Sequence, residues 1–344
     1  MPGRFASPAA GRDRRGALAG WPAAALLAVG AVAAQTAAPP QLYLPVQCRP
    51  GTDCWIQNYV DNDPTAGARD YRCGTRSYDR HDGTDIRLRD LAAMHAGVAV
   101  LAGAAGRVAA VRDGMPDVSV RAAEAAAVDG RECGNGVRIE HPGGWSTQYC
   151  HMARGSIAVR PGQSVAAGQP LGRIGLSGQT EYPHLHFTVR LGTQTVDPFA
   201  QGAPSGSCAG GQSLWAPAAA ALLAYEARSV LATGFSAGAP EPQALAAGPL
   251  PAPAADSPAL VAHAAAIGLQ GGDVQRLLVR APDGSVFADN QAEPLPRPQA
   301  QSFLFAGRRR PAAGFAAGRY SAVYEVRREG AVVLRREFVL ELAR

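Results

Sequence analysis

Short apolar runs separated by glycine and proline turns fill the middle of this 344-residue chain. Between residues 76 and 200 the runs include 98–101, 106–111, 137–139 and 186–189, and turn residues bound each of them. Runs this short match β-strands and fall well below the length of a typical helix. The spacing therefore predicts a mainly β domain over 76–200.

The C-terminal quarter repeats this pattern. Residues 275–280, 302–305, 319–326 and 331–334 read as strands, and the turns 282–284 and 328–330 lie between them. Alternation with turns at this spacing is typical of a small β-sandwich, which we expect over 258–344. Residues 201–257 are expected to be a linker with one helix, at 215–233, followed by an extended Ala/Pro/Gly-rich stretch.

The N-terminus has the layout of an export signal. Arg4, Arg12, Arg14 and Arg15 precede an apolar run that ends in small residues near 34. This layout predicts a signal peptide over 1–34 and a protein of the periplasm or cell envelope, without a membrane contact after cleavage. The alternative is an uncleaved N-terminal membrane anchor, although Gly20, Pro22 and Gly30 weaken a spanning helix. A cysteine-containing N-terminal extension over 35–75 follows.

Six cysteines lie after the signal, an even number that suggests disulfides in an oxidising compartment. One pair can be argued from the residues: Cys133 and Cys150 flank a strand, a turn and a strand, and a hairpin brings them close to register. Cys48 and Cys54 can close a small loop, which leaves Cys73 with Cys208. Zinc ligation by these thiols would need a paired Cys-x-x-Cys spacing that the sequence lacks.

The net charge of +5 does not point to nucleic acid, because the arginines are scattered over the chain. Residues 112–131 interrupt the strand pattern, and their Ala-rich stretch at 121–128 predicts one or two helical turns in an inserted loop.

Two histidine phrases, with His151 between them, carry the chemistry. His81 and Asp85 are four residues apart, and His184 and His186 are two apart, so each pair shares one face of an extended segment. Two histidines and a carboxylate can hold zinc with one tetrahedral position left for water. From spacing alone, the ligands are His81, Asp85 and one of His184 or His186. The remaining histidine and His151 would then face the open position and handle protons.

Residues 78–199 resemble the lysostaphin/LytM-type zinc endopeptidases of bacterial cell walls. The resemblance covers about a third of the chain and rests on several segments in a fixed order: 80–86, 134–141, 147–151, 159–165, 171–175, 184–187 and 196–198. It implies a compact fold with an antiparallel sheet. It also implies that His81, Asp85 and His186 bind zinc, and that His151 and His184 form the catalytic pair.

The same resemblance implies hydrolysis of peptide bonds in peptidoglycan stem peptides or cross-links. Two alternatives stay open: a binding or regulatory module that activates other wall hydrolases, and a zinc peptidase that acts on proteins. The sequence departs from the family at Glu181, Tyr182 and Pro183, which add charge and bulk at the expected rim of the cleft. The C-terminal β domain lies outside the resemblance and is a candidate surface for a regulatory protein partner.

Overall fold

The computed structural model describes residues 38–121 and 128–343. The predicted signal peptide and most of the helical turns predicted at 121–128 lie outside the described residues. Within the described residues, no helix has the length and apolar character needed to cross a membrane.

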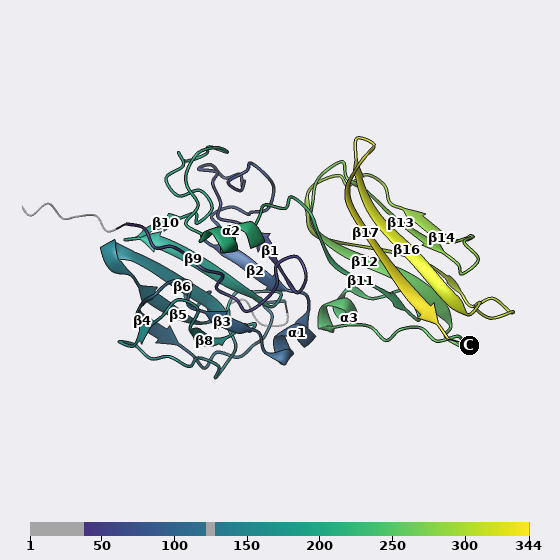
Figure 1. Cartoon of the computed structure of the whole chain (residues 1–344), viewed down its shortest axis with the longest axis horizontal. Helices are drawn as coiled ribbons and strands as arrows, with labels where there is room; N and C mark the ends of the chain where they lie inside the picture. The colour runs from purple at the N-terminus through teal and green to yellow at the C-terminus, as the bar shows by residue number, and fades with distance from the viewer. Residues whose placement is uncertain (1–37, 122–127, 344) are drawn as a thin grey trace, which may run out of the picture. The chain divides into compact units, whose positions relative to one another are not determined.

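An antiparallel sheet of eight strands forms the frame of the N-terminal part (Figure 1). Its order is β1 (Cys54–Asn58), β2 (Thr84–Leu88), β9 (His184–Leu191), β6 (Trp145–Met152), β5 (Asn135–Glu140), β4 (Gly106–Arg112) and β7 (Ser164–Val165), with β10 (Gln194–Val196) paired to β9. A separate two-stranded sheet joins β3 (Ala99–Leu101) to β8 (Pro170–Arg173). The helical segments described in this part include α1 (Leu91–Ala96) and the 3-10 turn Pro142–Gly144. The predicted mainly β, antiparallel fold is confirmed.

The side chains of strand β9 alternate between the hydrophobic core and the face that carries the histidines. Leu185, Phe187 and Val189 are buried in the hydrophobic core, as expected of alternate residues on one face. His184 and His186 project from the opposite face of the strand. Burial of three large apolar side chains fixes the register, because a slip of one residue would exchange the two faces.

The core of this sheet includes residues from both sides of the predicted boundaries at 75 and 200. Leu42 and Tyr59 from the N-terminal extension are fully buried in it, and so is Trp215 from the predicted linker. Backbone hydrogen bonds join these outer segments, since Leu42 N–H donates to Leu214 O at 2.8 Å and Ala216 N–H donates to Leu42 O at 2.7 Å. Described residues from Leu42 to Leu223 therefore contribute to one core.

The helix predicted at 215–233 is only partly present. Helix α2 covers Pro217–Leu222, and residues 229–236 form strand β11 (Ser229–Ser236). Pairing of β11 with β12 (Ala259–Leu269) buries Val230 and Phe235, and this burial outweighs the helical preference of the neighbouring alanines. The stretch expected to be extended at 235–257 also contains a short helix, α3 (Pro242–Ala247).

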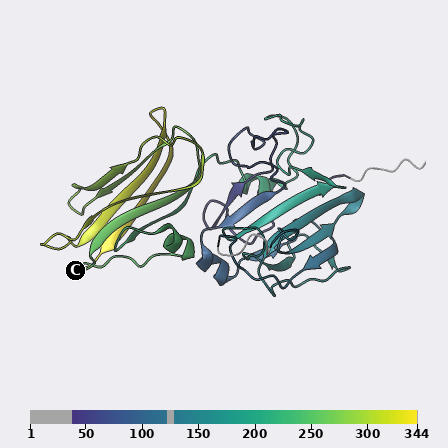
Figure 2. The same cartoon turned by 180° about the vertical axis from the view of Figure 1, so that it is seen from behind.

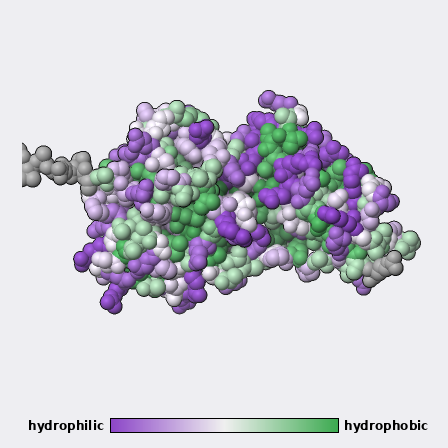
Figure 3. Space-filling view, in the orientation of Figure 1, coloured by the Kyte–Doolittle hydropathy of each residue, from purple (hydrophilic) through white to green (hydrophobic). Residues whose placement is uncertain are grey.

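The C-terminal strands form two sheets around their own core, as the sequence predicts (Figure 2). One sheet has the order β11, β12 and β15 (Gln299–Arg309). The other has the order β14 (Val286–Gln291), β13 (Val274–Arg280), β16 (Gly318–Arg328) and β17 (Ala331–Leu342). Hydrophilic and hydrophobic residues are interspersed over the face of the protein seen in Figure 3, as is usual for half-exposed strands.

All six cysteines are paired, as Cys48–Cys54, Cys73–Cys208 and Cys133–Cys150. The pair Cys133–Cys150, the one that the sequence argued for, is confirmed. Cys133–Cys150 ties the segment before β5 to β6, in the hairpin that the spacing predicted.

Candidate metal centre

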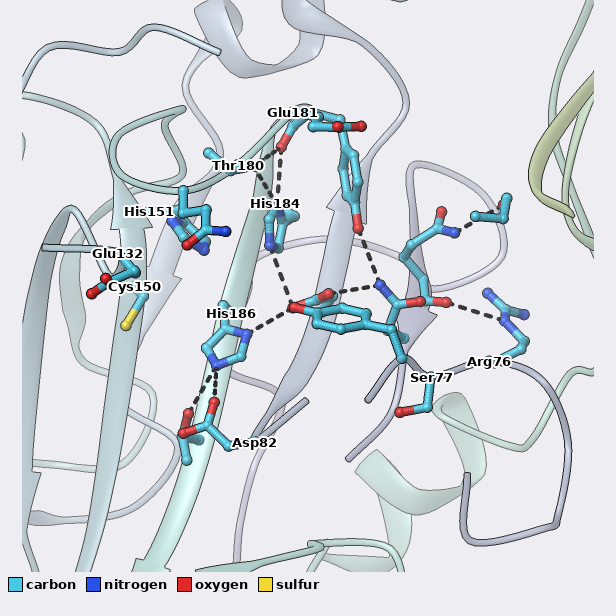
Figure 4. Close-up of a pocket in the computed structure, with 18 of the residues that line it drawn as sticks. Arg76, Ser77, Asp82, Glu132, Cys150, His151, Thr180, Glu181, His184 and His186 are labelled. Atoms are coloured by element: carbon cyan, nitrogen blue, oxygen red, sulfur yellow. Dashed lines mark hydrogen bonds and ion pairs between the residues drawn. The ribbon is translucent and has the colours of Figure 1, made fainter. Parts of the chain in front are cut away.

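Strand pairing brings the histidine phrases together. In the register of β2 with β9, Asp85 lies opposite His186, and in the register of β6 with β9, Cys150 lies opposite His186. His151 therefore follows directly after a residue that is aligned with His186. Five residues that span 106 positions of sequence meet beside these three adjacent strands. Three of them, His151, His184 and His186, are labelled in Figure 4.

Three donor atoms converge as a metal site requires. His81 Nε2 lies 3.1 Å from Asp85 Oδ1 and 3.2 Å from His186 Nδ1, and His186 Nδ1 lies 2.9 Å from Asp85 Oδ1. Tetrahedral zinc with bonds of about 2.0–2.1 Å would separate its ligand atoms by about 3.3 Å. The donor set and its spacing fit zinc closely. His81, Asp85 and His186 are thus the residues that could hold the ion.

Hydrogen bonds on the far side of each ring orient these imidazoles. His81 Nδ1–H donates to Tyr59 O at 2.6 Å, which leaves its Nε2 free to coordinate. His186 Nε2 faces Asp82 Oδ1 and Thr188 Oγ1, each at 3.1 Å, which leaves Nδ1 free. Such partners fix the tautomer of a metal-binding histidine and raise its basicity.

The other two histidines are anchored through Nδ1 and present Nε2. His184 Nδ1–H donates to Tyr182 O at 2.9 Å, and His151 Nδ1–H donates to Ser177 O at 2.8 Å. Their ring centroids are 4.6 Å apart. His184 Nε2 also lies 3.3 Å from Asp85 Oδ1. His184 forms a second three-donor group with His151 and His186, but it does not join His81 and Asp85 in one as His186 does. The two rings therefore border the metal position together.

The backbone is constrained at two positions next to the site, His151 and Gly83. His151 has a left-handed φ of 62°, and its N–H donates to Cys133 O at 2.8 Å. A non-glycine residue held in this region is strained, and such strain is concentrated at functional sites. At Gly83, an added Cβ would lie 2.6 Å from the ring of His186, so only glycine lets the loop after His81 pass this close.

Charge and burial set the protonation states. Burial would raise the pKa of Asp85, but the imidazoles around it hold that pKa well below its usual range. Burial lowers the pKa of His151 well below 6.5, and the charge of the neighbouring histidines lowers it further, so its ring is neutral at pH 7. Burial would also lower the pKa of His186, yet hydrogen bonds to Asp82 and Asp85 raise it to about 9. The two carboxylates therefore favour the charged form of the His186 ring.

A cleft of about 780 Å3 opens over these residues. At its rim, Glu181 carries the charge that the sequence predicts, and Glu181 Oε2 forms an ion pair with Arg121 Nη2 at 2.6 Å. Tyr182 is turned inward, since its hydroxyl accepts a hydrogen bond from Asn58 at 3.3 Å and the Arg87 guanidinium lies 4.5 Å from its ring centre. The bulk expected at the rim is therefore held by specific contacts.

Sequence reasoning missed several contributors. Asn58 donates to Asp85 Oδ2 at 2.8 Å and lies in the N-terminal extension, outside every motif. Arg190 and Gln148 line the same cleft and were not singled out. The one sequence signal for these two residues is the alternation of side chains along a strand, which puts residues an even number apart on the same face. Arg190 is four residues after His186, and Gln148 is two residues before Cys150.

Comparison with known proteins identifies the domain that holds this site. Residues 79–198 match the model of peptidase family M23. This stretch of the chain is an M23 peptidase domain of the LytM type. The resemblance drawn from the motifs is confirmed for these residues.

Curated relatives match a fifth to a third of this chain. The cell division protein DipM of Caulobacter vibrioides is 30% identical over 118 residues, which is 34% of this chain and 16% of DipM. The peptidoglycan DD-endopeptidase ShyB of Vibrio cholerae is 39% identical over 64 residues, 19% of this chain and 15% of ShyB. The chain thus spans about a sixth of the length of these relatives.

Among solved structures, the catalytic domain of lysostaphin from Staphylococcus simulans is 21% identical with a TM-score of 0.27. The similarity covers 41% of this chain and 86% of the lysostaphin domain.

Proposed function

We propose that the protein is an exported zinc endopeptidase that hydrolyses peptide bonds in peptidoglycan stem peptides or cross-links. The observation that carries the proposal is the complete set of five side chains around one point. The set includes side chains suited to bind the metal and side chains suited to transfer protons. His81, Asp85 and His186 offer three converging donors, and His151 and His184 border the remaining space.

The three donors would hold the metal ion. Zinc supplies a Lewis acid that polarises the scissile carbonyl and increases the acidity of water. One carboxylate among the ligands leaves the ion with a formal charge of +1, so the site retains a net attraction for a developing oxyanion.

His151 and His184 would handle the protons and the oxyanion. The lowered pKa of His151 keeps its Nε2 unprotonated at pH 7, so this atom can accept a proton from the attacking water. Transfer of that proton to the departing amine completes hydrolysis. His184 can hydrogen-bond the oxyanion through Nε2 when it is protonated there, because its Nδ1 stays bound to Tyr182 O.

Peptidoglycan is the proposed substrate because relatives of the domain are named for it, ShyB among them. Three disulfides suit a compartment outside the cytoplasm, which supports action in the periplasm or cell envelope. The C-terminal β domain lies outside the matched residues, and we assign it to a regulatory or wall-anchoring contact that leaves the chemistry to the M23 domain.

The test combines metal content with product formation. Purified protein should bind one zinc per chain and release peptides from purified peptidoglycan. His186→Ala should lose both properties, while a control at the exposed His95 of α1, His95→Ala, should retain them. Equal hydrolysis by wild type and His186→Ala would contradict the proposal.

A regulatory module is the second candidate, since one relative is named a cell division protein and not a peptidase. A folded wild-type protein that binds no zinc but increases the activity of another wall hydrolase would favour this candidate.

A further inference from the structure

Asp82 is the residue of the histidine phrase to which no motif gives a role. Its Oδ1 lies 3.1 Å from His186 Nε2, the ring nitrogen that points away from the three donors. Figure 4 shows a dashed line from His186 to Asp82, and His186 Nδ1, on the other side of the ring, lies 2.9 Å from Asp85 Oδ1. The carboxylate therefore contacts the histidine where it can orient the ring without competing for the metal.

Two further side chains hold Asp82 in this position. Arg190 Nη2 donates to Asp82 Oδ2 at 2.5 Å, and Arg190 Nη1 donates to Gln148 Oε1 at 2.9 Å. Gln148 Nε2 lies 3.3 Å from the sulfur atoms of Cys133 and Cys150. The chain of contacts runs from a loop through β9 to β6 and ends at a disulfide.

The Asp82 side chain is 45% exposed, so the fold does not depend on it as a buried structural contact. A solvated loop carboxylate gains little stability from one exposed ion pair. The ring of His186 is by contrast largely buried, and its Nε2 needs a partner. Thr188 Oγ1 offers a neutral partner at 3.1 Å, so Asp82 adds charge and direction beyond what Thr188 supplies.

We propose that Asp82 is a positioning residue for the metal ligand His186, and that Arg190 and Gln148 hold its carboxylate in place. This inference rests on the proposed zinc site. A carboxylate on the outer nitrogen of a ligating imidazole strengthens the metal bond, and loss of such a partner typically weakens metal affinity about 10- to 100-fold.

Zinc affinity measured against a competing chelator, without substrate, tests this role. Asp82→Ala should raise the zinc Kd about 10- to 100-fold, and Asp82→Asn should raise it less because an acceptor oxygen remains. The matched control is Asp79→Ala, since Asp79 has the same 45% side-chain exposure and contacts Arg80 at 3.7 Å. Its zinc Kd should stay within about twofold of wild type. Thermal unfolding of the metal-free variants checks that each one folds.

A double-mutant cycle tests the supporting role of Arg190. Arg190→Gln should weaken zinc binding in the wild-type background and change the Kd less than about twofold in the Asp82→Ala background. The inference is overturned if Asp82→Ala binds zinc like wild type, if Asp79→Ala loses as much affinity, or if wild type binds no zinc. Failure of the proposed peptidase activity would appear separately, as a zinc-bound wild-type protein that cleaves no peptidoglycan.

Discussion

Each histidine of the site has one ring nitrogen tied to the protein, and this single contact separates the roles. Backbone carbonyls hold Nδ1 of His81, His184 and His151, whereas His186 is held through Nε2. As a result, His186 presents Nδ1, and the other three present Nε2. Ring orientation is thus fixed before a ligand arrives, which is the condition for electrostatic preorganisation.

Removal of the proton-handling rings should separate catalysis from metal binding. We expect His151→Ala and His184→Ala each to lower kcat/KM about 10²- to 10⁴-fold, the usual contribution of a general acid or base. Zinc content should remain at one per chain, because His81, Asp85 and His186 form a three-donor group without either ring, even though both rings also converge with His186. Activity on cross-linked muropeptides and metal analysis of the same samples measure the two effects. Loss of zinc from both variants would contradict the division of roles.

Zinc binding should depend on pH through His186. Its pKa of about 9 in the metal-free protein means that a proton occupies the ligand ring below that pH. Zinc must displace this proton, so log Kd should fall by about one per pH unit as the pH rises from 6 towards 9, and then level off. Chelator competition at a series of pH values measures this slope. A Kd independent of pH between 6 and 8 would contradict it.

Motifs were sufficient to name the five central residues but not their supports. His81, Asp85 and His186 are recognisable because their spacing and neighbours recur as phrases. Asp82 and Arg190 are 108 positions apart and meet only because β2 pairs with β9, so their contact could not be read from either phrase alone. Contacts of this kind need the register of the sheet.

At the level of elements, the Cys133–Cys150 disulfide holds the end of β6 where His151 takes its left-handed conformation. Replacing both cysteines by serine should lower the free energy of unfolding by about 3 kcal/mol, the entropy of a 17-residue loop. Activity should fall as well, because Cys133 O accepts the His151 N–H.

The matched control is the Cys48–Cys54 disulfide, which closes a loop of six residues. Its double serine variant should lose about 2 kcal/mol of stability and retain kcat/KM in the folded fraction. Equal activity of the two double variants would show that the Cys133–Cys150 bond has no role at His151. Denaturant unfolding and muropeptide cleavage provide both readouts.

The stability of the fold should depend on pH through Asp197, which lies just after β10. Burial raises its pKa to about 7, and its Oδ2 has no hydrogen-bond partner in the described residues. The folded state therefore binds a proton more tightly than the unfolded state, and stability should fall as pH rises from about 4 to 7. The loss is on the order of 4 kcal/mol. Asp197→Asn should remove this part of the pH profile and raise stability at pH 8; an unchanged profile would contradict the assignment.

Short strands could be predicted from the sequence, whereas the fate of the alanine-rich segment after Trp215 could not. Alanine favours helix locally, and α2 does form over Pro217–Leu222. The residues that follow become β11 because β12 offers a pairing edge, and β12 begins 30 residues further along the chain. Tertiary pairing at that distance leaves no mark in the local sequence.

For the molecule as a whole, the functional unit is larger than the matched family domain. The match covers 79–198, but Leu42 and Trp215 lie in the same core as β9. Trp215 is 5.8 Å from the ring of Phe187, the residue next to His186. Segments before and after the domain therefore support the strand that carries the site.

Loss of Trp215 should destabilise this core. Trp215→Ala is expected to lower the free energy of unfolding by about 3–5 kcal/mol, because it removes a buried aromatic side chain. Leu222→Ala, at a side chain that is 56% exposed in the neighbouring helix, is the control and should change it by less than about 0.5 kcal/mol. Similar values for the two variants in denaturant unfolding would show that the segment is not part of the core.

We propose that the five clustered residues, with zinc, catalyse hydrolysis of a peptide bond of peptidoglycan. Mass spectrometry of a defined cross-linked muropeptide, incubated with the zinc-loaded protein in H2 18O, tests it most directly. We predict two product peptides, a single 18O atom in the new carboxylate, and no product from His186→Ala or after chelation. An intact muropeptide under conditions in which ShyB cleaves the same substrate would contradict the claim.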